Sequence, residues 1–254
     1  MKPEWTELAV EIEAARGGGY LLDARTSEQM PKDVSDCYQV QDRAIELSGI
    51  TPRAWKLGAP ALSAQAAMGL AEPFSGPVLP GMVFDSPAAL ETADFSCHKY
   101  EPEIAITLAH DIDGPIGVEE ARAAIASYHP AIEIINFRAV NGASHGATGM
   151  IADLGANGAL VLGAAVPEPA ADYAAMILDV RINGESVASR TPPPPETDPA
   201  ILLAWFSGHI TARGYTLKAG DVITTGSQAG LLPYTPGDLI EADFGPAGIA
   251  SVQC

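Results

Sequence analysis

The chain has 254 residues, of which 47% are hydrophobic and 18% charged, a balance typical of a globular protein rather than a disordered one. Its 32 acidic and 14 basic residues give a formal net charge of -18, which repels nucleic acids and anionic membrane surfaces. The composition therefore predicts a globular protein that binds neither nucleic acid nor a membrane.

The N-terminal segment predicts a helix over residues 4–16, because Trp5, Leu8 and Ile12 recur at helical spacing and the glycines that begin at Gly17 end the pattern. The mixture of Glu and Trp with apolar residues lacks the uninterrupted apolar core of a signal peptide. Together with cysteines too few and scattered for a disulfide framework or a Cys-based zinc site, this favours a cytoplasmic protein.

A second helix is predicted over residues 34–48, before Gly49. We interpret residues 1–52 as an N-terminal helical portion and residues 53–254 as a β-rich catalytic domain, the two forming one integrated unit. The β-rich part consists of short apolar runs between Gly, Pro and Asp turns, which predict many strands and an α+β fold. These runs are AWKLG, PVLPGMVF, EIAITLA, AIEIINF, ALVLGAAV, MILDVRING, DVITTGS and DLIEADFG.

Two further helices are predicted within this part, over residues 118–127 and 199–214. The dipeptide Asn183–Gly184 predicts a tight hairpin turn between two strands. The small residues from 141 to 149 are typical of a mobile loop.

Glu101 and Glu103 lie two residues apart in a predicted strand, so their side chains project from the same face. Two carboxylates at that distance repel one another unless a cation lies between them. Pro102 between them favours an edge strand or the start of a strand. An exposed acidic edge without a metal remains the alternative.

Glu133 is a single carboxylate within the apolar strand PAIEIIN, where a buried acid needs a partner, although a solvated face is the alternative. If it meets Glu101 and Glu103, the three acids form the all-oxygen site that Mg²⁺ or Mn²⁺ prefers. In the segment WKLG, Lys56 could enter the same pocket and bind a carboxylate or transfer a proton, or it could lie at the surface over Trp55.

The order of these motifs resembles that of the 2-keto-4-pentenoate hydratase branch of the fumarylacetoacetate hydrolase superfamily. The resemblance covers most of the chain. It rests on WKLG, MGLAEP, EPEIAITL, PAIEIINFR, MIADLGANGALVLG and LKAGDVITTG, in that order.

The resemblance implies a β-rich mixed roll with an N-terminal helical portion, assembled as a homo-oligomer. It also implies a lyase that needs Mg²⁺ or Mn²⁺ and hydrates 2-hydroxy-dienoates or decarboxylates a related 2-oxo acid during the breakdown of aromatic compounds. Glu101, Glu103 and Glu133 match the family's metal ligands, and Lys56 matches its pocket lysine.

The chain departs from the family at the positions expected to contact the substrate. Phe74 stands where the family usually has an acidic residue, and Leu154 and Gly155 stand where Asn and Ser are usual. Glu72 or Ser75 could replace the missing acid. Phe74, Ser75, Asp153 and Leu154 are therefore the predicted substrate-binding positions.

Two further candidates for catalysis follow the strand that carries Glu133. Arg138 could pair with a substrate carboxylate, or it could form a structural ion pair. His145 lies in the predicted mobile loop and could act as a general base, as a loop His can in the related carbon–carbon hydrolases, or it could simply be solvated. Besides the lyase, two hypotheses stay open: a hydrolase of an acylpyruvate, and a non-catalytic ligand-binding protein on the same fold.

Overall fold

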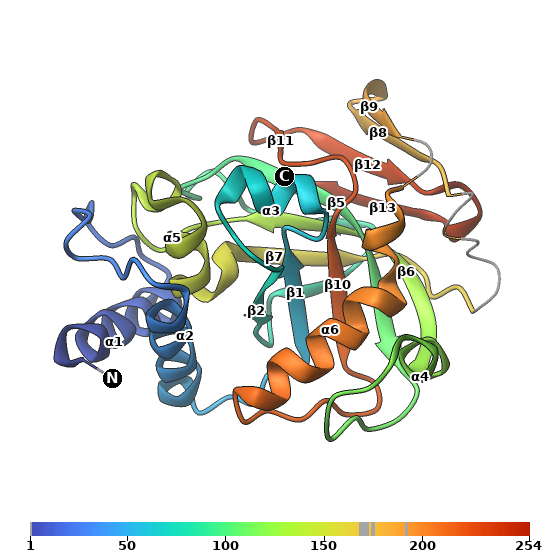
Figure 1. The fold of residues 1–254 in the computed structure, drawn as a ribbon. Helices are drawn as coiled ribbons and strands as arrows, with labels where there is room; N and C mark the ends of the chain where they lie inside the picture. The colour runs from blue at the N-terminus through green and yellow to red at the C-terminus, as the bar shows by residue number, and fades with distance from the viewer. Residues whose placement is uncertain (1, 168–172, 174–175, 191–192) are drawn as a thin grey trace.

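The computed structural model describes residues 2–167, 173, 176–190 and 193–254 (Figure 1). No helix within these residues is long and apolar enough to cross a membrane. The described residues form two sheets with helices around them, which confirms the predicted α+β roll.

The larger sheet is mixed and has eight strands. Seven of them run in the order β2-β1-β10-β5-β6-β7-β3, and β11 pairs with β5. Strand β1 is parallel to β10 and β3 is parallel to β7, whereas the other pairs are antiparallel. The strands are β1 (Ala54–Gly58), β2 (Phe74–Val78), β3 (Val83–Asp85), β5 (Lys99–Leu108), β6 (Ile125–Ile135), β7 (Asn157–Leu162), β10 (Val222–Ser227) and β11 (Leu232–Pro233).

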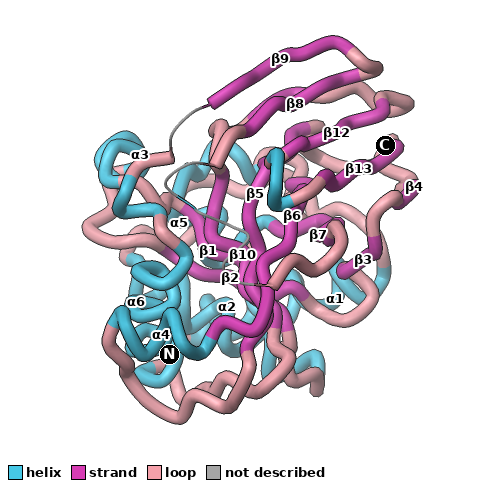
Figure 2. The backbone as a smooth tube through the Cα atoms, turned by 90° about the vertical axis from the view of Figure 1, so that its right-hand side faces the viewer, coloured by secondary structure: helices cyan, strands magenta, loops and turns pink. Residues whose placement is uncertain are grey.

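The smaller sheet has five strands and lies beside the larger one (Figure 2). Its order is β4-β13-β12-β8-β9, with a hairpin between β8 and β9. The predicted Asn183–Gly184 turn is confirmed, because both residues have the positive φ, 52° and 85°, that a type I′ turn requires. The strands are β4 (Ala88–Ala89), β8 (Leu178–Ile182), β9 (Glu185–Arg190), β12 (Leu239–Asp243) and β13 (Ile249–Gln253).

The N-terminal helices α1 (Pro3–Gly18) and α2 (Val34–Ser48) confirm the first two predicted helices and lie together at one end of the molecule (Figure 1). Both end at a glycine in the left-handed conformation, Gly19 and Gly49, as the glycine signals predicted. Helix α6 (Pro199–Ala212) lies over the strands β1 and β10, and its Phe206 packs on Trp55 with ring centroids 5.8 Å apart. Part of the core therefore lies between this helix and the larger sheet, and the same cluster of buried residues extends to α1, α2 and the smaller sheet.

Two predictions about helices and loops need correction, and one helix was missed. The segment predicted as a mobile loop is helical, with a 3₁₀ turn at Gly142–His145 followed by α5 (Gly146–Ala152), which packs against α2. Gly149 permits close packing of α5 on the preceding 3₁₀ turn, since a Cβ at Gly149 would lie 2.6 Å from Cβ of His145. Helix α3 (Leu62–Met68) was not predicted, and α4 (Val118–Ala124) ends earlier than expected because β6 begins at Ile125.

Candidate metal centre

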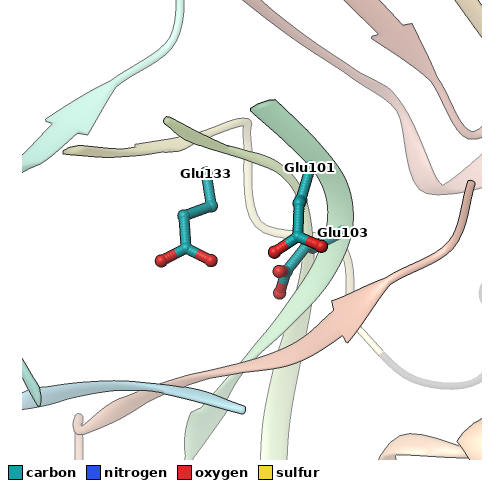
Figure 3. A group of neighbouring side chains, drawn as sticks. All are labelled: Glu101, Glu103 and Glu133. Atoms are coloured by element: carbon teal, nitrogen blue, oxygen red, sulfur yellow. The ribbon is translucent and has the colours of Figure 1, made fainter. Parts of the chain in front are cut away.

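The pairing of β5 with β6 brings the three predicted carboxylates together (Figure 3). Glu101 lies directly opposite Glu133 in the antiparallel ladder, and Glu103 is two residues further along the same face. One oxygen from each carboxylate lies within 4.8 Å of the others. Two neighbouring strands thus hold three acids close enough to share one cation.

Strand β5 lies in the middle of the sheet, so the expectation of an edge strand at Pro102 was wrong. The carbonyl of Pro102 accepts a hydrogen bond of 2.8 Å from the backbone N–H of Gln228. The missing N–H of Pro102 therefore faces the side where β10 is irregular, since its register to β5 shifts between Thr224 and Ser227. An interrupted ladder tolerates the proline in a central strand.

Burial makes the negative charges costly. Glu103 and Glu133 are fully buried, and the side chain of Glu101 is 16% exposed. Burial raises the pKa of Glu101 to about 7, against the attraction of Lys56, and burial followed by repulsion from the other two carboxylates raises the pKa of Glu103 well above its usual range. A divalent cation would offset this cost.

Each of the two fully buried acids has one oxygen bound by a donor and one without a hydrogen-bond partner. The backbone N–H of Gly226 donates to Oε2 of Glu103 at 2.9 Å, and Nδ2 of Asn157 donates to Oε1 of Glu133 at 2.8 Å. Among the described residues, Oε1 of Glu103 and Oε2 of Glu133 have no hydrogen-bond partner, although Oε2 of Glu133 forms an ion pair with Nζ of Lys56, 3.2 Å away. Buried acceptors without partners are rare, so these two oxygens are suited to a metal ion.

Lys56 enters the same site from β1. Its side chain is fully buried, and Nζ lies 3.2 Å from Oε2 of Glu133 and 4.0 Å from Oε2 of Glu101. Burial opposes its charge, but the attraction of the three carboxylates outweighs burial and raises the pKa of Lys56. Lys56 therefore brings a positive charge to the edge of the acidic cluster.

The donor set fits a hard divalent cation. Three carboxylates with open oxygens match the oxygen ligands of Mg²⁺ or Mn²⁺, and would leave about three positions of an octahedral shell for other ligands. Glu101, Glu103 and Glu133 would hold the ion, with Lys56 beside them.

Phe74 and the turn at Leu154–Ala156 lie next to Lys56. The ring of Phe74 is centred 5.1 Å from Nζ of Lys56 and covers Gly58, where a Cβ would overlap that ring. At Gly155, with φ of 75°, a Cβ would lie only 3.0 Å from Cδ of Lys56 and from Cα of Gly76. Leu154, with φ of 52°, is held in a conformation that is unfavourable for a non-glycine residue. The surroundings of Lys56 on this side are thus apolar and close-packed.

The structure does not bring Ser75 to the carboxylates, because neighbouring residues of a strand face opposite sides. Phe74 lies against Lys56, whereas the hydroxyl of Ser75 lies 3.1 Å from Nε2 of His209 and accepts a bond from Arg213. Glu72, the other suggested replacement for the family's acid, accepts a hydrogen bond from Nε1 of Trp205. Neither side chain has a contact with the acidic cluster among the interactions of the described residues.

Arg138 and Asp153 form a buried ion pair, with Nη1 3.5 Å from Oδ1. The guanidinium also donates to the carbonyls of Asn136 and Asn157, and the carboxylate accepts from the backbone N–H of Arg138. Burial lowers the pKa of Arg138 and raises that of Asp153 to about 6. This pair braces the backbone between β6 and β7.

His145 has no contact with the three carboxylates among the interactions of the described residues. It lines a cavity of about 10 Å³ together with Leu8 and Ile12 of α1 and Asp153. Its Nε2 is buried and has no hydrogen-bond partner among the described residues. The base expected for a hydrolase therefore faces the N-terminal helices.

Sequence reasoning missed Asn157 and Gly226, the two donors to the buried acids. Asn157 begins the observed strand β7, two residues before the predicted run ALVLGAAV. Gly226 lies within the run DVITTGS, where an isolated glycine indicates a bulge. That signal was available for Gly226, whereas the role of Asn157 depends on strand pairing.

Comparison with known proteins agrees with the resemblance found in the sequence. A model of the fumarylacetoacetate (FAA) hydrolase C-terminal family matches residues 61–254. The 2-hydroxyhexa-2,4-dienoate hydratase of Comamonas testosteroni is 29% identical over 227 residues, which cover 87% of this chain and 86% of the relative.

Two solved structures share the fold. The 4-oxalocrotonate decarboxylase of Pseudomonas putida G7, complexed with magnesium and adipate, matches with a TM-score of 0.87 at 22% identity, over 100% of this chain and 98% of that one. The fumarylpyruvate hydrolase of Pseudomonas aeruginosa, in complex with Mn²⁺ and pyruvate, matches with a TM-score of 0.62 at 16% identity, over 80% and 90% of the two chains. At these identities the likeness establishes the fold alone.

Proposed function

The chain belongs to the fumarylacetoacetate hydrolase family, and from this premise we propose that it is a divalent-metal-dependent lyase that hydrates or decarboxylates a small 2-oxo or 2-hydroxy-dienoic acid. The observation that carries the proposal is the buried cluster of Glu101, Glu103 and Glu133, with two open oxygens and Lys56 3.2 Å from one of them. Such a cluster is costly without a cation. Mg²⁺ and Mn²⁺ are the ions to test first.

The proposed mechanism assigns a role to each of these groups. A bound divalent cation would polarise the 2-oxo group of a chelating substrate and stabilise negative charge on its oxygen. Lys56, protonated and buried beside Glu133, would hold the substrate's negative charge and donate a proton to its carbon chain. Phe74 and Leu154 would contact the apolar part of the substrate.

The hydrolase hypothesis is less well supported by the arrangement. It needs a base that activates water, and His145 lines the cavity beside α1 instead of the acidic cluster. The ligand-binding hypothesis predicts metal or substrate binding without turnover. Homo-oligomer formation and a cytoplasmic location remain predictions from the sequence.

The test is an assay of the purified protein with Mg²⁺ or Mn²⁺ against three substrates, followed by ultraviolet absorbance: 2-hydroxypenta-2,4-dienoate, oxaloacetate and an acylpyruvate. We expect turnover of the dienoate or of oxaloacetate, abolished by a chelator and restored by the metal. Turnover of the acylpyruvate alone would favour the hydrolase, and metal binding without any turnover would favour the ligand-binding protein.

The metal ligands are tested separately by calorimetry. Glu103→Gln and Glu133→Gln should each weaken Mg²⁺ binding by more than the 10- to 100-fold that is typical of losing an outer-shell partner. The matched control is Glu185→Gln, an exposed residue of β9, which should bind as the wild type does. Unchanged affinity in the two site variants would show that the acids are misassigned.

A further inference from the structure

A β-bulge places Asn157 on the face of the sheet that carries Glu133. In the regular part of the β6–β7 pair, Glu133 lies opposite Leu160 and Ile134 opposite Ala159. The register then shifts, so that Ile135 lies opposite Asn157 rather than Gly158. Because alternate residues share a face, the bulge presents Asn157 on the side of Ile135 and Glu133, where a regular strand would present a glycine.

The amide of Asn157 fixes one oxygen of Glu133. Its side chain is almost fully buried, with 1% exposed, and Nδ2 donates to Oε1 of Glu133 at 2.8 Å. An ionised carboxylate only accepts, so the amide nitrogen is the atom that must face it. Oδ1 of Asn157 has no hydrogen-bond partner among the described residues. A buried amide oxygen without a partner is unfavourable, and an apolar side chain of similar size would avoid this cost. The presence of the amide therefore indicates that it is needed for its bond to Glu133.

The backbone of Asn157 is held in turn by Arg138. Nη2 of Arg138 donates to the Asn157 carbonyl at 2.5 Å, and the guanidinium is paired with the buried carboxylate of Asp153. Together these contacts form a chain from Asp153 through Arg138 to Asn157, which ends on Glu133. They anchor the bulge that directs the amide.

We propose that Asn157 is a positioning residue that restricts Glu133 to binding a metal through Oε2 alone and thereby favours Mg²⁺ over Ca²⁺. The inference rests on the proposed metal centre. Mg²⁺ demands near-ideal octahedral geometry, whereas Ca²⁺ accepts more ligands and bidentate carboxylates. With Oε1 occupied by Asn157, Glu133 offers one oxygen; without that bond, the carboxylate can rotate and offer both.

The experiment measures the dissociation constants of Mg²⁺ and Ca²⁺ by calorimetry for the wild type and for Asn157→Leu, which keeps the approximate size of the side chain and removes its donor. We expect the Mg²⁺ constant to rise by about 10- to 100-fold, the range typical of an outer-shell partner. The Ca²⁺ constant should rise by a smaller factor or fall. Asn157→Ala, which removes the donor and also leaves a cavity, should likewise raise the ratio of the Mg²⁺ constant to the Ca²⁺ constant.

The matched control is Asn136→Leu. Asn136 lies next to β6 and its side chain accepts hydrogen bonds from Ser96. Its side chain has no hydrogen bond to a carboxylate within the part of the chain that the structure describes, so the ratio of the two constants should not change. If both ions lose affinity equally in the folded Asn157 variants, or if neither does, Asn157 has no positioning role. If the wild type binds neither ion, the proposed function fails, and this inference fails with it.

Discussion

Replacing Lys56 by Met should tighten Mg²⁺ binding and abolish turnover. Met is a long, flexible side chain without charge, so it can fill most of the space of the lysine stem between Phe74 and Gly155. The ammonium lies 3.2 Å from Oε2 of Glu133, one of the oxygens left open for a cation. Lys56 and the metal therefore compete for the same carboxylate, while the proposed reaction needs both.

The expected change in Mg²⁺ affinity follows from the distance between Nζ of Lys56 and Oε2 of Glu133. At an effective dielectric constant of about 20, two unit charges 3.2 Å apart attract each other by roughly 5 kcal/mol. Metal binding in the wild type must weaken part of the attraction between Lys56 and Glu133, whereas the variant has no such attraction to lose. Each 1.4 kcal/mol of this difference corresponds to about a tenfold change in metal affinity. We expect the Mg²⁺ dissociation constant of Lys56→Met to fall by about tenfold or more.

Without metal, Lys56→Met should be less stable than the wild type by about 3–5 kcal/mol, because the buried carboxylates lose the ammonium group of Lys56. Mg²⁺ at about 100 times its dissociation constant should return about 2.7 kcal/mol of the free energy of unfolding. Calorimetry, urea unfolding with and without Mg²⁺, and the ultraviolet assay measure the three effects. Lys99→Met, at an exposed position of the same strand as Glu101, is the control. Mg²⁺ affinity that falls or stays constant in a folded Lys56→Met would refute the competition, and retained turnover would refute the role of Lys56 in the reaction.

Two further predictions concern the surroundings of the site. Gly155→Ala should lose most turnover, because the new Cβ would lie 3.0 Å from Cδ of Lys56. The positive φ of 75° should also cost about 1–2 kcal/mol of stability. Mg²⁺ affinity is the control measurement, and normal turnover would show that Lys56 tolerates the contact. Burial, followed by repulsion from Arg213, lowers the pKa of His209 to about 4, so the unfolded chain binds a proton between pH 6.5 and 4 that the folded protein does not. The free energy of unfolding should therefore fall by at most about 3 kcal/mol as the pH drops through this window. In His209→Gln, the free energy of unfolding, measured with urea, should depend less on pH over the same window. A pH dependence equal to that of the wild type would rule out His209 as the group responsible.

Local sequence patterns were sufficient where a structure depends on neighbouring residues. Helical spacing and the glycines after it located α1 and α2, and Asn183–Gly184 located the hairpin between β8 and β9. The two-residue spacing of Glu101 and Glu103 placed both on one face, because alternation is a property of any single strand.

The same patterns failed where a structure depends on contacts between distant segments. Residues 141–149 are rich in small residues and were predicted to form a loop, but the packing of α5 against α2 stabilises a helix there. Ser75 and Phe74 were equally plausible as substrate contacts, and only the pairing of β2 with β1 determined which of them lies beside Lys56.

For the acidic cluster, the sequence by itself determined which residues carry the charge and that two of them share a face. Tertiary structure decided that Glu133 lies opposite Glu101, that Lys56 reaches both, and that two bulges bring Gly226 and Asn157 to the buried acids. The physical reason is that alternation along a strand is local, whereas register and bulges depend on pairing with another segment of the chain. The sequence therefore predicts which residues supply the ligand atoms, whereas the fold determines the directions in which the carboxylate oxygens point.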